Sequence, residues 1–266
     1  MLLTIDIGTS TFKSALFDID GNILSSAFVP LSIKSEGVKH EVQPSLWLNA
    51  FEECCKKLIS LSLSSVSKKF PPSDLREVQA VIISGNGPSL VPVLYEGNGV
   101  PVENARLWLD RRAAGYQEEV TQVMGGFVDA CFFLPKILYI KNNEKKLYEK
   151  TKSFLGCPEY LAYALTRETR TVFPCEGFDR WFWNDDVLSK LKLEKEKFPP
   201  FIRPGEPFGK ITSKNAKIFG FKKNIPVISG GPDFFAAILG SGVTTPGQAC
   251  DRSGSSEGIN LCTCNK

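Results

Sequence analysis

The sequence predicts an α/β protein, and three observations lead to that prediction. Apolar runs of strand length, bounded by glycine, proline and polar residues, alternate with apolar residues at helical spacing. Of the 266 residues, 42% are hydrophobic and 23% are charged, which is typical of a globular protein with enough chain to bury a core. The segment at Asp6 is similar to the segment at Asp251: in both, an acid ends an expected strand and a turn of small residues follows.

The first sixty residues are expected to form three strands and a helix. Turns of small and polar residues separate apolar runs at 2–7, 12–17 and 23–29. Pro44 is placed as the first residue of the helix, because Trp47, Phe51 and further apolar residues follow at helical spacing. His40 is expected in the loop before this helix.

The middle of the chain is expected to be richer in helix. Further strands are predicted at 78–83, 90–94 and, more briefly, near 153–155. One helix is predicted from Asp110 to about Val123, and residues 135–166 are predicted to be mostly helical. Residues 171–183 are predicted to be extended, with Trp181, Phe182 and Trp183 as packing residues.

The last part of the chain repeats the pattern of strand, turn and helix. A strand at 225–229 is followed by Gly230 and Gly231, and Pro232 and Asp233 suit the start of a helix because an acid is favoured there. A final strand is predicted at 248–251.

Composition narrows the class of protein. The 32 basic and 29 acidic residues leave a net charge of +3, too weak and too scattered to indicate binding to nucleic acid or to an anionic membrane. No apolar run approaches the roughly 18 residues that span a bilayer. The 8 Cys contain no CxxC pair and there is 1 His, so the chain has few ligands for a zinc site. Most cysteines are expected to be buried, and the protein is expected in the reducing cytoplasm.

The turn after the first strand has residues that suit a phosphate group. Gly8 lets backbone N–H groups approach an anion, and Thr9 and Ser10 add hydroxyl donors. Asp6 could orient a water bound to Mg²⁺, and Lys13 could reach a phosphate. The alternative is a hairpin with a polar turn, since the chain contains no GxxxxGK[ST] motif and no complete dinucleotide fingerprint.

Two further positions could carry chemistry. Asp233, between a Gly-Gly turn and an apolar helix, could act as a general base, or it could simply cap the helix. Trp108, Asp110 and Arg112 offer an aromatic ring, a carboxylate and a guanidinium that suit polyol hydroxyls, or they form a surface cap with an ion pair.

Taken in order, these pieces resemble the FGGY family of carbohydrate kinases, of the actin/Hsp70/hexokinase superfamily, and its xylulokinase-like members in particular. The motifs that carry the resemblance are Asp6-Ile-Gly-Thr-Ser, the WxDxR segment at Trp108–Arg112, Pro135-Lys136 with Tyr139, Pro158-Glu159-Tyr160-Leu161, Gly230-Gly231-Pro232-Asp233, and Ser253-Gly254-Ser255-Ser256. The resemblance covers nearly the whole chain but only the N-terminal half of such kinases.

The resemblance implies a ribonuclease H-like, actin-like ATPase domain with a mixed five-stranded sheet, flanked by helices on both faces, over residues 1–245. Residues 246–266 would be the opening hairpin of a second, nucleotide-binding domain. The implied activity is ATP-dependent phosphorylation of a sugar or polyol hydroxyl. The expected partners are that substrate and ATP with Mg²⁺, without nucleic acid or membrane, and with a homodimer left open.

The resemblance also implies the role of each site residue. Asp233 would accept the proton of the attacking hydroxyl and, with Asp6, would lie at the Mg²⁺. The residues that would bind phosphate are Asp6, Gly8, Thr9, Ser10, Lys13, Ser253, Gly254, Ser255 and Ser256. The residues that would face the sugar are Asn86, Gly87, Pro88, Trp108, Asp110 and Arg112.

The chain differs from the family in the segment that is expected to contact the sugar. Xylulokinase-like members carry Gln-Met-His where this chain has Asn86-Gly87-Pro88, and glycine and proline offer no side-chain donor. Arg252 replaces a small residue in the second phosphate turn. Two alternatives therefore stay open: a non-catalytic sugar-binding or scaffold relic of the same fold, and an Hsp70-like ATPase, which the WxDxR and GGxD motifs disfavour.

Overall fold

A mixed β-sheet lies at the centre of the structure, a computed structural model that describes residues 1–64, 74–95, 103–252 and 258–264. The strand order is β12-β13-β6-β1-β2-β3, with β1 paired in parallel to β6 and β6 to β13, and the other neighbours antiparallel. The strands are β1 (Leu2–Ile7), β2 (Thr11–Phe17), β3 (Ile23–Pro30), β6 (Ala80–Gly85), β12 (Pro207–Lys210) and β13 (Pro226–Pro232). The α/β prediction is confirmed, and β12 makes the sheet six-stranded instead of five-stranded.

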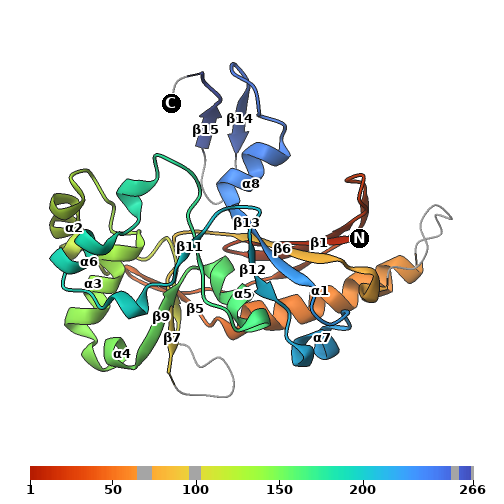
Figure 1. Ribbon diagram of the computed structural model, residues 1–266, viewed down its shortest axis with the longest axis horizontal. Helices are drawn as coiled ribbons and strands as arrows, with labels where there is room; N and C mark the ends of the chain where they lie inside the picture. Colours follow the sequence, from red (N-terminus) through yellow and green to blue (C-terminus); the bar gives the residue numbers. More distant parts are fainter. Residues whose placement is uncertain (65–73, 96–102, 253–257, 265–266) are drawn as a thin grey trace.

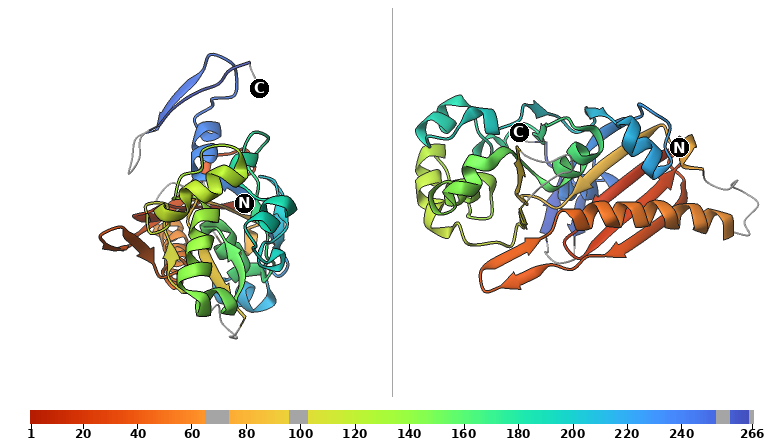
Figure 2. Two further views of the ribbon diagram at one scale, coloured as in Figure 1. Left: turned by 90° about the vertical axis from the view of Figure 1, so that its left-hand side faces the viewer. Right: turned by 90° about the horizontal axis from the view of Figure 1, so that it is seen from below.

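One face of the sheet is covered by the helices α1 (Ser45–Ser64) and α5 (Cys157–Thr166), as Figures 1 and 2 show. Alternate residues of β1 point to this face and are buried, so β1 is half-buried, as its alternating sequence pattern predicts. Phe51 of α1 is fully buried and its ring lies 4.7 Å from that of Phe219, at the end of α7 (Ser213–Phe219). Helix α1 begins one residue after Pro44, the expected first residue.

The other face is reached by α8 (Asp233–Gly240), which contacts β13 and β6. Ala236 of α8 lies beside Thr4 of β1 and Ile82 of β6 on that face. Thr4, Asp6 and Lys13 are only partly buried or exposed there. Helices therefore contact both faces, as expected, although the second face carries much less cover.

A second apolar core belongs to a helical lobe beside the sheet (Figure 1). Its main elements are α2 (Gln117–Met124), α3 (Phe133–Asn143), α4 (Lys145–Lys150), α6 (Asp185–Lys190) and β9 (Thr151–Leu155). Strand β9 pairs with β7 (Val91–Leu94), whose buried Val91 and Val93 belong to the core under the sheet. Phe182 and Trp183 are buried in this core, as their expected packing role requires, and Trp181 packs against it. Among the described residues no helix is both long and apolar enough to cross a membrane.

Three local predictions are wrong, and each fails because a tertiary contact decides the structure. Helix α2 begins at Gln117, after a 3₁₀ turn, since Asp110 lies in a separate turn where it binds Arg112. His40 lies in β5 (Lys39–Val42), which pairs with β4 (Lys34–Glu36) and β8 (Ala105–Arg106).

The segment expected to be extended at 171–183 forms only the short strand β10 (Thr171–Val172), paired with β11 (Phe201–Ile202), and then a 3₁₀ turn at Asp179–Trp181. All eight cysteines are free thiols, but only Cys54, Cys55 and Cys157 are buried, fewer than expected.

The C-terminal residues form an antiparallel hairpin of β14 (Ala249–Arg252) and β15 (Gly258–Leu261), which extends away from the body of the protein next to α8 (Figure 1). A hairpin therefore follows the acid at Asp251, as one follows the acid at Asp6. The residues expected to form the second phosphate turn, Ser253, Gly254, Ser255 and Ser256, lie outside the described residues.

Removing the buried ring of Phe51 should test the core under the sheet. Phe51→Ala should lower the free energy of unfolding by about 3–5 kcal/mol, because the ring is lost from a packed site and leaves a cavity. Phe28→Ala is the control, since Phe28 is 63% exposed on the same sheet. Urea unfolding measures both variants, and equal losses would contradict the assigned core.

Candidate functional site

Two acids lie at the same edge of the central sheet. Asp6 of β1 is in register with Ser84 of β6, and Ser84 is in register with Gly231 of β13. Adjacent strands are about 4.8 Å apart, so the row from Asp6 to Gly231 spans roughly 10 Å. Asp233 follows Gly231 by two residues. Both carboxylates also affect the pKa of one buried thiol. The pKa of Cys157 is raised mainly by burial, and further by the negative charges of Glu159, Asp233 and Asp6.

The turn after β1 is tight and requires a glycine. The N–H of Gly8 donates to the carbonyl of Thr11 at 3.0 Å, and a Cβ at Gly8 would lie 2.8 Å from that same oxygen. Thr9 Oγ1 accepts a hydrogen bond from Trp108 Nε1 at 3.0 Å, which joins this turn to the WxDxR segment. Ser10 is exposed. The expected phosphate turn is therefore a firm loop whose outer hydroxyl is open to a ligand.

Asp6 and Lys13 pair across the first hairpin. Lys13 Nζ lies 3.2 Å from Asp6 Oδ2, and the two side chains are 61% and 41% exposed. Water surrounds such a pair and little free energy holds it together. Both groups remain available to an incoming phosphate or cation.

Asp233 is the first residue of α8, as the sequence predicts. The N–H of Phe234 donates to Asp233 Oδ1 at 2.6 Å, and the helix N-terminus favours the negative charge. Asp233 itself lines neither of two cavities at this place, but residues on both sides of it line them.

The first cavity, about 380 Å³ in volume, lies at the carboxyl ends of β6 and β13. Its aromatic walls are Phe132, Phe133, Phe178, Trp181, Phe182 and Phe234. Phe132 stacks on Trp181 with ring centres 5.6 Å apart, and Phe178 stacks on Phe234 at 5.8 Å. Gly87, Pro88, Gly231 and Pro232 also line this aromatic cavity.

The second cavity, about 650 Å³ in volume, lies on the less covered face of the sheet. Asp6, Lys13, Ser84, Gly230 and Ala236 are among the residues that line it. The segment that carries Asp233 thus contributes Gly231, Pro232 and Phe234 to the aromatic cavity, and its neighbours Gly230 and Ala236 to the cavity of Asp6.

Glu159 places a carboxyl group in the wall of the aromatic cavity. The residue is 7% exposed in the first turn of α5, and burial raises its pKa to about 7, although hydrogen bonds from the N–H groups of Glu159 and Val172 oppose the rise. Oε1 accepts from Val172 N–H at 3.1 Å. A Cβ at Gly156 would overlap with Glu159 Oε2, so a glycine before the helix makes room for the carboxyl group.

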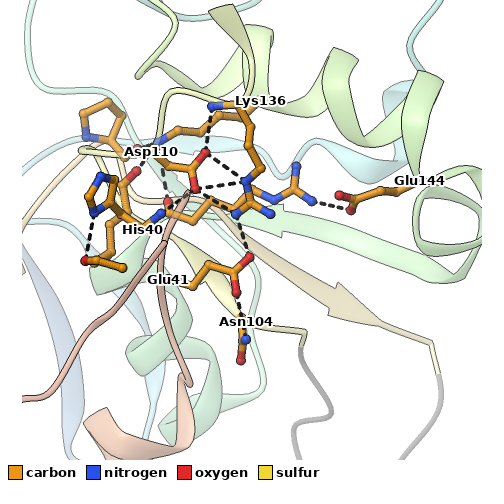
Figure 3. A network of polar contacts seen from close by, with 11 residues as sticks. His40, Glu41, Asn104, Asp110, Lys136 and Glu144 are labelled. Carbon is orange, nitrogen blue, oxygen red and sulfur yellow. Dashed lines mark hydrogen bonds and ion pairs between the residues drawn. The ribbon is translucent and has the colours of Figure 1, made fainter. Parts of the chain in front are cut away.

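Asp110 and Arg112 belong to a buried polar network, which Figure 3 shows around Asp110. Asp110 is fully buried, and it accepts hydrogen bonds from the backbone of His40 at 2.9 Å and from Arg112 Nη2 at 2.7 Å. Arg112 Nη2 also lies 2.6 Å from Glu41 Oε1. These hydrogen bonds hold the pKa of Asp110 below its usual value despite burial. Neither Asp110 nor Arg112 is among the residues that line the aromatic cavity.

Lys136 ties this network to the cavity wall. Its buried ammonium donates to the carbonyls of Pro88 at 2.8 Å, Leu107 at 2.7 Å and Arg106 at 3.4 Å. Burial lowers the pKa of Lys136 to about 7, with a smaller opposing effect from Cys131 and Asp110. The PK motif therefore fixes the backbone that presents Pro88, a role that sequence reasoning did not assign.

The polar atoms of Asn86 are also committed inside the protein. Asn86 Nδ2 donates to Ile7 O at 2.9 Å and Oδ1 accepts from Ser89 Oγ at 2.5 Å. Of the six positions expected to face a sugar, Gly87 and Pro88 line the aromatic cavity. Trp108 donates to Thr9, and the polar groups of Asn86, Asp110 and Arg112 are hydrogen-bonded inside the protein. Sequence reasoning missed Glu159, although an acid in the otherwise apolar helix 157–166 was a signal for it.

The fold is similar to that of solved carbohydrate kinases. Residues 1–240 match the family model described as the N-terminal domain of the FGGY family of carbohydrate kinases, and the chain belongs to that family. The expected family and its actin-like fold are confirmed.

Curated and solved relatives agree with this assignment. Over 255 residues the chain is 26% identical to a xylulose kinase of Staphylococcus epidermidis, covering 91% of this chain and 49% of the relative. The fold is similar to that of a xylulose kinase from Brucella ovis (TM-score 0.80, 21% identity, 97% and 53% of the two chains). It is also similar to that of a gluconate kinase from Lactobacillus acidophilus (TM-score 0.78, 20% identity, 97% and 53%). The chain thus spans about half the length of these relatives.

Breaking the buried pair of Asp110 and Arg112 should be costly. Asp110→Ala should lower the free energy of unfolding by about 3–5 kcal/mol, because it leaves a guanidinium that is 9% exposed without its main partner. The control is Glu52→Ala, which breaks an exposed pair with Lys56 and should change stability by at most about 0.5 kcal/mol. Urea unfolding at pH 7 checks both values. A loss for Asp110→Ala as small as that of the control would refute a supporting role.

The ionisation of Glu159 should make stability depend on pH. Folding raises its pKa from 4.5 to about 7, so the protonated form is favoured in the native state. Its contribution to stability is complete below pH 4.5 and is lost as the pH rises through 7. Glu159→Gln cannot ionise, so its melting temperature should rise relative to wild type between pH 4.5 and 7 and then level off.

Thermal melts of Glu159→Gln at several pH values test this prediction, with Glu118→Gln on exposed α2 as the control. The difference in melting temperature between Glu118→Gln and wild type should stay constant with pH. A difference for Glu159→Gln that is constant or falls with rising pH would contradict the buried carboxyl.

Proposed function

We propose that the intact protein transfers the γ-phosphoryl group of ATP to a hydroxyl of a sugar or polyol, and that this chain binds the acceptor alcohol. The observation that supports the proposal is the chain around Asp233, the first residue of α8: Gly231, Pro232 and Phe234 line the aromatic cavity, whereas Gly230 and Ala236 line the cavity of Asp6. A base at this point would act between a site for an alcohol and a site for phosphate.

Asp233 would accept the proton of the attacking hydroxyl as the phosphoryl group leaves ATP. Phosphoryl transfer depends chiefly on positioning and on neutralising charge, and the rigid start of a helix holds the carboxylate in place. The aromatic walls of the cavity would exclude water from the acceptor, which protects the phosphoryl group from hydrolysis.

Asp6, Gly8, Thr9, Ser10 and Lys13 would receive the phosphates of ATP. The carboxylates of Asp6 and Asp233 are hard oxygen donors that fit Mg²⁺, which keeps most of its waters and takes one or two carboxylates with the phosphates. In the described part of the chain no group of three or more His, Cys, Asp or Glu residues gathers as a metal site, so the phosphates and water would complete the coordination. Bound Mg²⁺ would neutralise phosphate charge.

The domain boundary proposed from the sequence has residues 1–245 as the acceptor domain and residues 246–266 as the start of a nucleotide domain. The support is the second hairpin, β14–β15, which extends away from the sheet domain. Ser253, Gly254, Ser255 and Ser256 would form the second phosphate turn. A cytoplasmic location is proposed because ATP is found there and the cysteines are free thiols; a homodimer stays a prediction.

Replacing Asp233 in the intact enzyme should separate catalysis from binding. Asp233→Asn removes the proton acceptor and keeps the shape, so turnover should fall at least ~10²-fold while affinity for the acceptor changes less. Asp6→Asn should instead weaken the use of Mg·ATP, and added Mg²⁺ should partly restore it. Steady-state titrations against the acceptor and Mg·ATP measure both effects.

Asp185→Asn is the matched control, because Asp185 is also the first residue of a helix but is exposed and pairs with Lys195. Its turnover should equal that of wild type. Normal turnover of Asp233→Asn would leave Asp233 as a helix cap and would refute its role as the base. Absence of ATP-dependent phosphorylation by the intact wild-type protein would instead favour the sugar-binding relic over the kinase.

A further inference from the structure

The aromatic cavity holds a single charged side chain among its described residues, and that side chain is Glu159. No lysine, arginine or histidine of the described chain lines it. The remaining wall consists of aromatic rings, prolines, glycines, Val172 and the thiol of Cys157, whose raised pKa keeps it neutral. The wall thus offers much apolar surface and few polar partners.

This composition is unsuited to a ligand with a hydroxyl on every carbon. Each hydroxyl that leaves water must find a partner, and a hydroxyl without one costs free energy. Gly87 and Pro88 supply no side-chain donor, and the amide of the adjacent Asn86 is already bonded to Ile7 and Ser89. A fully hydroxylated ketose would therefore leave hydroxyls unpaired against the aromatic rings.

An acidic ligand is disfavoured by charge. Above pH 7 Glu159 is mainly ionised, because its pKa is about 7, and a ligand carboxylate in this cavity would then meet its negative charge without a cation among the described lining residues. Two carboxyl groups in one apolar site raise each other's free energy of ionisation. The cavity therefore selects against sugar acids as well as against bare ketoses.

We infer that the acceptor for this site is an uncharged alcohol that carries a flat apolar group, such as an aromatic ring, with Glu159 as the hydrogen-bond acceptor that orients its hydroxyls. The inference rests on the proposed function for the phosphoryl transfer, but the binding of such an alcohol does not depend on it. The cavity volume of about 380 Å³ lies in the range of small-molecule sites.

The position of Glu159 suits this role. Oε1 is held by Val172 N–H at 3.1 Å, and the N–H of Glu159 itself also bonds to the carboxyl group. A carboxylate has about four acceptor positions, so these two bonds fix the group and leave capacity for a ligand hydroxyl. Stacked Phe178 and Phe234 lie in the same wall, and Phe234 directly follows Asp233. An apolar group against these rings would bring the hydroxyl end of the ligand near the base.

Binding to the 266-residue chain can be measured with simple probes. Calorimetry and tryptophan fluorescence, to which Trp181 of the cavity contributes, compare 3-phenoxypropane-1,2-diol with glycerol, D-xylulose and 2-hydroxy-3-phenoxypropanoate. The phenoxy diol should bind at least about tenfold more tightly than glycerol or xylulose, because its ring is removed from water. The phenoxy acid should bind at least about tenfold more weakly than the diol.

Two variants locate the binding. Gly87→Leu should abolish diol binding without unfolding the chain, because a Cβ at Gly87 has no atom within 4 Å and the new side chain enters the cavity. Glu159→Gln should weaken the diol about three- to tenfold and remove most of the discrimination against the acid. Glu118→Gln is the matched control on exposed α2 and should bind like wild type.

The outcomes separate this inference from the proposed function. Xylulose or the phenoxy acid binding as tightly as the diol, or unchanged selectivity in Glu159→Gln, would overturn the inference. If the intact protein phosphorylates xylulose with ATP and ignores the diol, the kinase proposal stands and this inference fails. If the diol binds as expected but no alcohol is phosphorylated, the kinase proposal fails and the ligand class stands.

Discussion

The pairing of three parallel strands is the constraint on which the rest of the structure depends. Because β1 and β13 both pair in parallel with β6, their carboxyl ends meet at one edge, and the acids that follow them meet there too. A slip of one residue in β1 would turn Asp6 to the buried face under α1 and α5. The buried Leu3, Ile5 and Ile7 prevent that slip, so the apolar core fixes the position of a polar site.

The elements with a regular apolar period were predictable from the sequence. The strands of β1, β2 and β3 and the helix α1 follow from their patterns, because one face of each is buried and the other is not. Strand β12 was not predictable, since Pro207-Phe208-Gly209-Lys210 has little strand propensity and is held by its pairing with β13. The turn at Asp110 was mistaken for a helix start because its contacts come from far away in the chain: the N–H of His40 donates to Asp110, and Glu41 pairs with Arg112.

Sequence reasoning found the parts of the site that carry a local sequence signal and missed the parts that do not. Asp6 lies near the end of β1 and Asp233 directly follows β13, and the resemblance to the family implied that the two acids lie together. The aromatic cavity has no such signal, because its walls come from segments as distant as Gly87, Phe132, Trp181 and Phe234. Only the assembled fold shows that Glu159 stands alone among apolar side chains, and that Asp110 is not among the residues that line the cavity.

The three hydrogen bonds of Lys136 have a consequence for how such a protein can diversify. Each acceptor is a main-chain carbonyl, of Pro88, Arg106 or Leu107, and every amino acid supplies the same oxygen at that position. The anchor is therefore indifferent to which side chain the anchored loop displays. Mutation at position 88 can remodel the surface that meets the ligand while the loop keeps its course, so new substrate preferences can arise in this scaffold without a new fold.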